Sequence, residues 1–387
     1  MLIIGAAVLS LLIWIYLLAA RGSFWRVGRG TAPKASGQAF PGLVAVVVPA
    51  RNEADVVGES VRSLLSQTGV QSVRIFLVDD CSTDGTAQAA RSAAAVVGKP
   101  EALTIVEGAP LPSGWSGKLW ATQQGLEKAR EVAPDFWLLT DADIVHAPDS
   151  IATLISVAET GPYDLVSFMV KLHCKTLAEK LLVPAFVFFF FMLYPPRWIA
   201  DRRNKTAGAA GGCILIRPEW LERAGGIAAI RGEIIDDCAL AARVKSAGGR
   251  LWLGVTPSTR SVRPYQSLGE IGRMISRTAF NQLHHSVWLL MISVFGLVLT
   301  YLAPPLLLLS HSRIAMVCGA LACVGMIVAY LPMVRFYGLS PVWVLTLPLT
   351  AVFYLVATLH SAWRFWSGRG GEWKGRMQDP RRQRALK

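Results

Sequence analysis

The stretch Leu77-Val78-Asp79-Asp80-Cys81-Ser82-Thr83-Asp84-Gly85-Thr86 decides the fold class, because an apolar, strand-like run ends directly in carboxylates. A second stretch, Leu138-Leu139-Thr140-Asp141-Ala142-Asp143, repeats this pattern. In α/β folds, side chains that follow a strand lie at the carboxyl edge of the sheet, where ligands bind. Paired aspartates at that edge can hold a divalent cation, since hard cations prefer oxygen ligands. The two stretches therefore predict an α/β domain with a metal and diphosphate site at one edge.

The surrounding region, from residue 41 to about 265, alternates between strand-like and helix-like segments. Apolar and β-branched runs predict the strands Leu43–Pro49, Arg74–Asp80, Leu103–Glu107 and Phe136–Thr140. Helical spacing predicts the helices Ala54–Gln67, Gly85–Val97 and Lys118–Arg130. Alternation at this interval predicts a mostly parallel sheet flanked by helices.

Composition indicates a membrane protein. Hydrophobic residues make up 53% of the 387 residues and charged residues only 17%, which is apolar for a soluble protein. The net charge of +13 fits anionic lipids or anionic substrates, with nucleic acid as the competing partner. The basic residues cluster beside apolar runs, so we expect a membrane and no nucleic acid. The six cysteines form no CxxC or Cys/His pair with metal spacing, which argues against zinc and fits a reduced compartment.

Residues 1–20 predict an N-terminal membrane anchor. The run Leu2–Ala20 is apolar almost throughout and about long enough to cross a bilayer. Four basic residues follow it, namely Arg21, Arg26, Arg29 and Lys34. Positive charge marks the cytoplasmic side, so we expect the amino terminus outside and the following domain in the cytoplasm. A cleaved signal peptide would carry its charges before the apolar run.

Residues 287–361 predict a C-terminal transmembrane region, and residues 363–387 a basic tail. The expected spans are Val287–Leu309, Ile314–Val334 and Val342–Leu359. Three spans from a cytoplasmic domain place the tail outside, whereas its Lys and Arg content favours the inside. Either one apolar run is re-entrant or the orientation rule fails, and the sequence leaves both alternatives open.

A further apolar run, at residues 181–196, interrupts the α/β pattern. It is short for a span, which leaves a buried core helix or a segment in the membrane interface. Because four consecutive phenylalanines, Phe188–Phe191, cannot all face inward on one helix, we favour the interface.

Several motifs resemble the family 2 glycosyltransferases of the GT-A fold. Pro49, Arg51 and Glu53 close the first strand, and Asp79 and Asp80 close the second, as in the nucleotide pocket of that family. A uracil ring needs a carboxylate or amide to accept its N3–H, and a buried acceptor discriminates strongly. The alternative for these aspartates is helix capping, which explains Ser82 and Asp84 better than it explains a pair at a strand end.

The stretch Asp141-Ala142-Asp143 is similar to the DxD motif of that family. The resemblance implies that Asp143, with Asp141 in support, ligates Mg²⁺ or Mn²⁺, which bridges the diphosphate of the sugar nucleotide and neutralises charge on the leaving group. His146 follows nearby as a structural histidine or a neighbour of the metal. Lys118, close to a predicted helix amino terminus, suits a phosphate site, with a solvated lysine as the alternative.

The acceptor side of the family pattern also has counterparts. The stretch Gly211-Gly212-Cys213 resembles the acceptor-side turn, which implies that Gly212 lies against substrate. Asp236 and Asp237 resemble the family's ED motif, with Asp236 replacing the glutamate and Asp237 as the general base that deprotonates the acceptor. The alternative for Asp236 is helix N-capping. Arg277 matches the arginine of the QxxRW motif of processive members, but the Gln and Trp are absent, so we expect transfer of a single sugar.

The fuller pattern resembles the hopene-associated glycosyltransferases of bacteria, through Leu182–Phe190, Ala209–Cys213, Ile235–Ala241 and Gly370–Arg376. The resemblance covers a GT-A domain at residues 41–280. It implies a membrane-bound, inverting, hexosyltransferase-type enzyme of the bacterial inner membrane. That enzyme would move a sugar from a nucleotide (UDP) sugar to a lipid acceptor linked to hopanoid metabolism.

Two other functions stay open. A polyprenyl-phosphate acceptor would need no base, and Arg217, Arg231 or Arg277 would then bind its phosphate. A catalytically inactive, nucleotide-binding membrane scaffold is the non-enzymatic alternative. A transporter is disfavoured because the expected spans lack internal carboxylates and a repeat.

Overall fold

The computed structural model describes residues 1–26, 39–368, 372–373 and 376–377, with side chains up to residue 368. The chain forms two compact units. The α/β unit comprises residues 30–173, 198–263 and 371–387, and the apolar-helix unit comprises residues 1–29, 174–197 and 264–370. Arg29, Lys34, most of the basic tail and most of the Gly370–Arg376 stretch lie outside the described residues.

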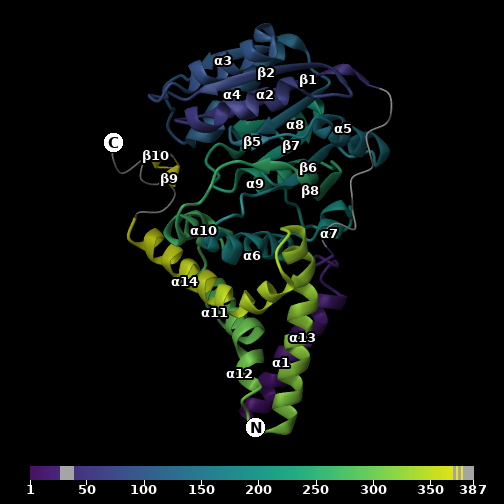
Figure 1. Ribbon diagram of the computed structural model, residues 1–387, viewed down its shortest axis with the longest axis vertical. Helices are drawn as coiled ribbons and strands as arrows, with labels where there is room; N and C mark the ends of the chain where they lie inside the picture. The colour runs from purple at the N-terminus through teal and green to yellow at the C-terminus, as the bar shows by residue number, and fades with distance from the viewer. Residues whose placement is uncertain (27–38, 369–371, 374–375, 378–387) are drawn as a thin grey trace. The chain divides into compact units, whose positions relative to one another are not determined.

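The α/β unit is built on one eight-stranded sheet with the order β3-β2-β1-β4-β7-β6-β8-β5 (Figure 1). The strands are β1 (Phe40–Ala50), β2 (Val70–Asp79), β3 (Leu103–Glu107), β4 (Phe136–Thr140), β5 (Ile144–Val145), β6 (Leu165–Lys171), β7 (Cys213–Ile216) and β8 (Leu251–Ser261). Strands β3, β2, β1 and β4 are parallel, whereas β7 runs antiparallel to β4 and β6. The expected mostly parallel sheet is therefore mixed, because β7 enters it in the opposite direction.

Helices flank this sheet. They are α2 (Ala54–Leu65), α3 (Thr86–Val97), α4 (Gly117–Ala129), α5 (Ser150–Thr160), α8 (Pro218–Arg223) and α9 (Asp236–Ser246), with short 3-10 turns at η1 (Pro100–Ala102), η2 (Arg130–Val132) and η3 (Ile227–Ile230). Helix α4 approaches the sheet closely at Gly125, where a Cβ atom would lie 2.5 Å from the Val47 side chain. Ser116 caps α4 by accepting a hydrogen bond from the Leu119 N–H. This packing fixes the first turn of α4, which carries Lys118.

The central strand β1 forms the core of the unit. Its residues Val44–Val48 are fully buried, as are Ile75 and Leu77 of β2 and Leu138 of β4. Each such side chain contributes about 1.5–3 kcal/mol through burial. The sheet is consequently a rigid support for the polar residues that follow its strands.

The apolar-helix unit contains five helical stretches that are long and apolar enough to cross a membrane, within the part of the chain described. Its elements are α1 (Leu2–Ala19), α6 (Leu177–Leu193), α7 (Pro196–Ala200, whose end belongs to the α/β unit), α10 (Leu268–Gln282), α11 (Val287–Leu297), the π turn η4 (Val298–Leu302), α12 (Ala303–Leu307), α13 (Arg313–Phe336), the 3-10 turn η5 (Pro341–Thr346) and α14 (Leu347–Trp366). The terminal strands β9 (Glu372–Trp373) and β10 (Arg376–Met377) pair with each other. Membrane-length helices at both ends of the chain agree with the sequence-based prediction.

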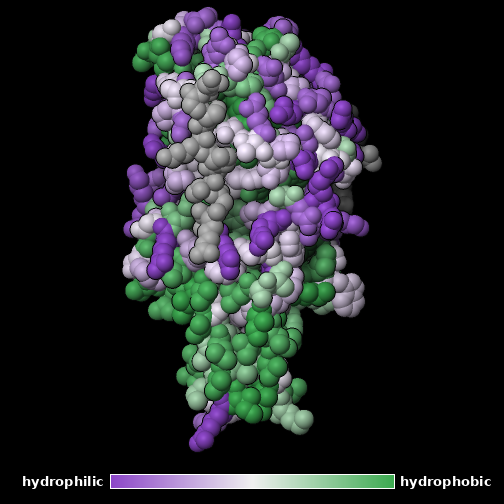
Figure 2. Space-filling model, turned by 90° about the vertical axis from the view of Figure 1, so that its right-hand side faces the viewer, coloured by the Kyte–Doolittle hydropathy of each residue, from purple (hydrophilic) through white to green (hydrophobic). Residues whose placement is uncertain are grey.

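Helices α1, α12 and α13 pack side by side as a stalk (Figure 1). The small residue Gly325 of α13 lets Trp14 of α1 approach, since a Cβ atom there would lie 3.3 Å from the Trp14 Cβ. The Trp14 indole N–H donates to the Thr300 carbonyl at 2.8 Å. Figure 2 shows that the visible face of the stalk is apolar.

Helix α6 corrects the expectation about the phenylalanine run. Phe188, Phe189 and Phe191 are buried, and only Phe190 is partly exposed. Segments distant in sequence cover this helix on several sides: Phe188 packs on Tyr330, and Phe189 on Tyr354. As expected, the four rings do not all face inward, but this does not by itself favour the interface, because one helix can be surrounded by partners. A position of this helix in the membrane interface stays a prediction.

Candidate active site

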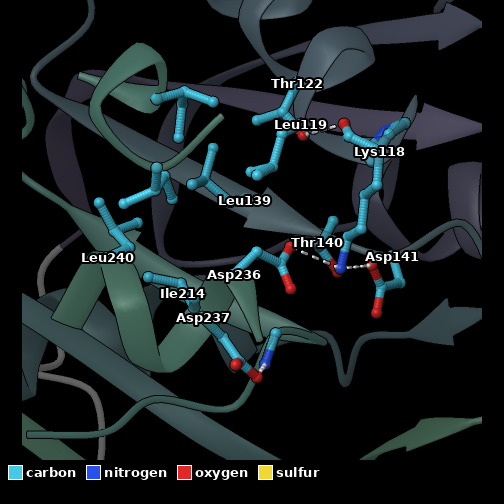
Figure 3. Close-up of a pocket in the computed structure, with 14 residues that line it drawn as sticks. Lys118, Leu119, Thr122, Leu139, Thr140, Asp141, Ile214, Asp236, Asp237 and Leu240 are labelled. Carbon is cyan, nitrogen blue, oxygen red and sulfur yellow. Dashed lines mark hydrogen bonds and ion pairs between the residues drawn. The ribbon is translucent and has the colours of Figure 1, made fainter. Parts of the chain in front are cut away.

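The carboxyl ends of β1 and β4 and the start of α9 border one pocket of the α/β unit (Figure 3). Five predicted site residues line it together, namely Pro49, Lys118, Asp141, Asp236 and Asp237. The rest of its wall consists mainly of leucine and isoleucine side chains, with Thr122, Thr140 and Gly211 between them, so the charged groups meet in a partly dry environment. Electrostatic interactions between these groups are therefore stronger than in water.

Lys118 is the cation of this pocket. Its Nζ lies 2.8 Å from Asp141 Oδ1 and 3.3 Å from Asp236 Oδ2, and it joins the two motifs directly (Figure 3). Burial alone would lower the pKa of the Lys118 ammonium, but the carboxylates of Asp141 and Asp236 outweigh that effect and raise it. Lys118 is consequently charged at neutral pH, and the alternative of a solvated lysine does not hold.

Asp237 is held by two backbone donors. The Gly211 N–H donates to Oδ2 at 2.8 Å, and the Cys238 N–H donates to Oδ1 at 2.7 Å. Burial and the neighbouring Asp236 carboxylate raise the pKa of Asp237 to about 6, although Lys118 and the two hydrogen bonds act in the opposite direction. This carboxylate is both fixed in orientation and able to take up a proton near neutral pH.

Asp236 starts α9 but does not cap it. The N-cap position is Ile235, with no side-chain capping bond, and Asp236 pairs with Lys118 instead. The capping alternative for Asp236 was therefore wrong. Beside it, Gly211 leaves room for the carboxylate of Asp237, because a Cβ atom there would lie 3.2 Å from Asp237 Oδ2. Gly212 lies one residue further on, and its carbonyl accepts a hydrogen bond from Thr140.

A second polar cluster surrounds Asp143. Its carboxylate accepts a 2.6 Å hydrogen bond from the Ser261 hydroxyl and lies 3.6 Å from Arg263 Nε. Arg263 also forms a close ion pair with Glu53. Sequence reasoning missed Ser261 and Arg263, which match no motif and reach Asp143 only because β8 ends beside β5.

The remaining donor-side residues lie where β1 and β2 end. Arg51 donates to the Asp80 carbonyl at 2.6 Å, and Asp79 accepts from the Ser82 N–H at 2.9 Å. Asp84 accepts from the N–H groups of Ala54 and Thr86, which begin α2 and α3. Asp84 thus binds N–H groups at the starts of two helices, although the N-cap position of α3 is Gly85, which makes no side-chain capping bond. Asp80 is fully buried at the end of its strand.

Two other candidates of the α/β unit do not line the pocket, and a third belongs to the apolar-helix unit. His146 is buried, shares a 3.0 Å hydrogen bond with Thr140, and has its pKa lowered to about 3 by burial, all of which fits a structural residue. Arg217 stacks over the Phe136 ring at 4.7 Å, at the amino end of β4. Arg277 lies on α10 in the apolar-helix unit, and its predicted role stays a prediction.

Asp141 and Asp143 carry carboxylate oxygens, which are the ligands that a divalent cation such as Mg²⁺ or Mn²⁺ prefers. Their side chains are partly exposed, at 35% and 15%. Among the described residues, no three His, Cys, Asp or Glu side chains converge as a closed metal site. A cation held here would need further oxygens from its ligand, as a diphosphate supplies.

Comparison with known proteins finds a family that about half of the chain is similar to. Residues 45–225 match the family model "Glycosyl transferase family 2". An undecaprenyl-phosphate 4-deoxy-4-formamido-L-arabinose transferase from Aeromonas hydrophila is 33% identical over 133 residues, which are 33% of this chain and 36% of that protein. The corresponding transferase from Yersinia enterocolitica is 34% identical over 32% of this chain and 35% of its own length. The chain thus spans about a third of the curated relatives it matches.

A solved structure shares the fold over nearly the whole chain. A mannosyltransferase from Pyrobaculum calidifontis, determined with GDP-Man and Mn²⁺, superposes with a TM-score of 0.57 at 18% identity, covering 93% of this chain and 99% of the other. Residues 45–225 are thus similar to glycosyltransferase family 2, and the fold of the chain is of the GT-A type. These findings confirm the expected fold, and the match over residues 45–225 supports the expected enzyme class, a glycosyltransferase.

Proposed function

We propose that the protein is a membrane-bound, inverting glycosyltransferase that moves one sugar from a nucleotide sugar to a hydroxyl group of a lipid. The observation that carries this proposal is the state of Asp237, which is fixed by two N–H groups and has a pKa raised to about 6. A hydroxyl nucleophile needs a base of this kind, positioned and able to accept a proton near neutral pH.

The donor would occupy the side of the pocket formed by Lys118 and Asp141. Lys118 would bind the diphosphate, and the residues from Pro49 to Glu53, with Asp79 and Asp80, would hold the base, for which we propose uracil. Asp143 with Asp141 would hold Mg²⁺ or Mn²⁺, which neutralises charge on the leaving diphosphate. Asp237 would take the proton of the acceptor hydroxyl, while its bonds to Gly211 and Cys238 keep its remaining lone pairs directed into the pocket.

For the acceptor we propose a lipid linked to hopanoid metabolism, in the inner membrane of a bacterium, with the glycosyltransferase domain in the cytoplasm. The support is the resemblance of the stretches around Leu182–Phe190 and Ala209–Cys213, together with the five membrane-length helices. Gly212 and Asp236 would then border the acceptor.

The second candidate acceptor is a polyprenyl phosphate. Two observations favour it: the curated relatives are named as undecaprenyl-phosphate transferases, and the Arg277 Nε is buried with no hydrogen-bond partner among the described residues. A guanidinium group whose Nε has no partner of this kind suits a phosphate oxygen. Such an acceptor is already anionic and would not depend on Asp237 as a base.

The test combines a donor panel with two acceptors. The purified protein is titrated with UDP- and GDP-sugars in the presence of Mn²⁺, and transfer is then measured to a lipid alcohol and to a polyprenyl phosphate. We expect Asp237→Asn to bind the donor but to lose transfer to the lipid alcohol. Glu219→Gln, which changes an exposed acid in the first turn of α8, is the matched control and should keep wild-type activity.

Two outcomes would overturn the first proposal. Full activity of Asp237→Asn toward the lipid alcohol would remove Asp237 as the base. Transfer to the polyprenyl phosphate alone, at a similar rate in wild type and variant, would establish the second candidate instead.

A further inference from the structure

The five membrane-length helices differ in what they pack against, and this difference bears on which of them cross the bilayer. If α1, the α11–α12 stretch, α13 and the η5–α14 stretch all cross, the basic tail ends on the side opposite the glycosyltransferase domain. The tail, residues 363–387, carries eight Lys and Arg against two Asp and Glu. Such a segment is expected on the cytoplasmic side.

Helix α6 cannot be a simple span, because both of its ends return to the same sheet. It lies between β6 and β7, which pair with each other at Leu165 and Ile216. The chain that follows α6 is again part of the α/β unit, where the carbonyls of Trp198, Ile199 and Thr206 accept hydrogen bonds from the Lys245 ammonium. One sheet cannot lie on two sides of a membrane, so α6 leaves and re-enters on one side.

Helix α10 is too polar for the hydrocarbon core. It is a 15-residue amphipathic helix that carries Glu270, Arg273 and Arg277, and Arg273 is exposed. A helix with one apolar face and charges on the other lies in the membrane interface.

Helix α14 packs on these two helices. The Ser361 hydroxyl accepts from the Phe280 N–H of α10 at 3.0 Å, and the Phe280 ring contacts Phe365. On α6, the Thr350 hydroxyl and the Tyr354 hydroxyl donate to the carbonyls of Leu181 and Leu182. One turn before Ala357, the ring of Phe353 on α14 lies against Gly272 of α10. Helix α14 therefore follows α10 from Phe353 to its end and must lie at the same depth.

The opposite face of η5–α14 is an exposed apolar stripe at alternating three- and four-residue spacing. Its members are Val342, Leu345, Leu349, Val352, Val356, Leu359, Trp363 and Trp366. This spacing places them on one side of a helix, and two Trp residues end the stripe, as is common for segments anchored at the interface. The stripe is the face that a helix lying flat would present to acyl chains.

We propose that α6, α10 and α14 form a layer that lies in the membrane interface, and that only α1, the α11–α12 stretch and α13 cross the bilayer. The chain then enters by α1, leaves by α11–α12 and returns by α13. The basic tail ends on the side of the glycosyltransferase domain, and so does Arg335, in the last turn of α13. The conflict between the number of spans and the charge of the tail disappears. This proposal does not rest on the reaction catalysed.

The test compares two positions that flank α13 and α14. In the full-length chain with its six native cysteines replaced, Ser310→Cys lies between α12 and α13, and Ser367→Cys lies directly after α14. A membrane-impermeant maleimide is applied to intact cells and to permeabilised cells. If only α13 separates the two positions, exactly one of them labels in intact cells, and we expect it to be Ser310→Cys. Labelling of both from outside, or of neither, would show that α14 crosses and would overturn the proposal.

A depth measurement keeps the proposal testable if either variant fails to insert. Nitroxide labels are placed at Leu345→Cys, Val352→Cys and Leu359→Cys in reconstituted vesicles, and the outer two are 14 positions apart along the stripe. A helix that lies flat keeps the three labels within about 5 Å of one depth, whereas a crossing helix spreads them over about 20 Å, at 1.5 Å per residue. A spread of the second size would refute the interface layer.

Discussion

Replacement of Lys118 by methionine is expected to move the acid limb of the pH–rate profile toward higher pH. The Lys118 ammonium lowers the pKa of Asp237, against burial and the Asp236 carboxylate, which raise it to about 6. The Asp237 Oδ2 and the Lys118 Nζ both lie within 3.4 Å of the position of a Cβ atom at Gly211, so they are separated by no more than about 7 Å. At that separation and an effective dielectric constant of about 20, their attraction is about 2 kcal/mol.

This energy corresponds to about 1.5 pH units, since one unit equals about 1.4 kcal/mol. As the proposed base, Asp237 must be deprotonated to act, so we expect kcat/KM to rise with pH through the pKa of Asp237. We expect a midpoint near pH 6 for the wild type and near pH 7.5 for Lys118→Met, measured as kcat/KM against pH at saturating Mn²⁺. Lys128→Met removes an exposed lysine from the same helix and should leave the midpoint unchanged. A midpoint for Lys118→Met at or below that of the wild type would refute the electrostatic reasoning.

Three further changes probe the clusters around Asp143 and Glu179. Asp143→Asn should abolish Mn²⁺-dependent binding of the donor in calorimetry, and binding that stays metal-dependent would contradict the assignment of this ligand. Arg263→Gln removes the cation 3.6 Å from Asp143, so Mn²⁺ should bind about tenfold more tightly in the absence of donor, a gain of about 1.4 kcal/mol. Electron paramagnetic resonance measures this binding, and unchanged or weaker binding would contradict the competition between Arg263 and the metal. Glu179 is fully buried and accepts three backbone N–H groups, so Glu179→Gln should cost about 1–3 kcal/mol of unfolding free energy, visible as a lower Tm in detergent.

The parts of the fold that were predictable are those specified by local pattern. The bounds of β3 and β4 agree with the apolar runs Leu103–Glu107 and Phe136–Thr140, and α2, α3 and α4 differ from expectation by one or two residues at an end. Short runs bounded by turn residues allow few alternatives. The direction of β7 was not predictable, because a four-residue strand carries no information about its partner.

The candidate site was predictable where a motif marks the residue, at the end of β4 for Asp141 and at the start of α9 for Asp237. It was not predictable where the fold alone brings residues together. Arg263 lies 120 positions from Asp143, in a segment without a motif, and only the course of β8 places its side chain there. The burial of Phe188 and Phe189 was missed for the same reason: their partners, Tyr330 and Tyr354, lie more than 140 residues away.

The charge balance of the site supports the proposed need for a divalent cation. Five carboxylates, those of Glu53, Asp141, Asp143, Asp236 and Asp237, face two cations, Lys118 and Arg263. A diphosphate would add negative charge to these two clusters, which already carry an excess of it, and this repulsion is costly where the groups are partly buried.

Lys118 and Arg263 each pair with one aspartate of the Asp141–Asp143 motif, so they balance these two carboxylates in the free protein. A metal ion that took over both aspartates would release the two cations toward the diphosphate. Donor and metal should therefore bind with positive cooperativity, each increasing the affinity for the other by the same factor. Calorimetric titration of donor at several Mn²⁺ concentrations measures that factor, and independent binding of the two would exclude the exchange of partners.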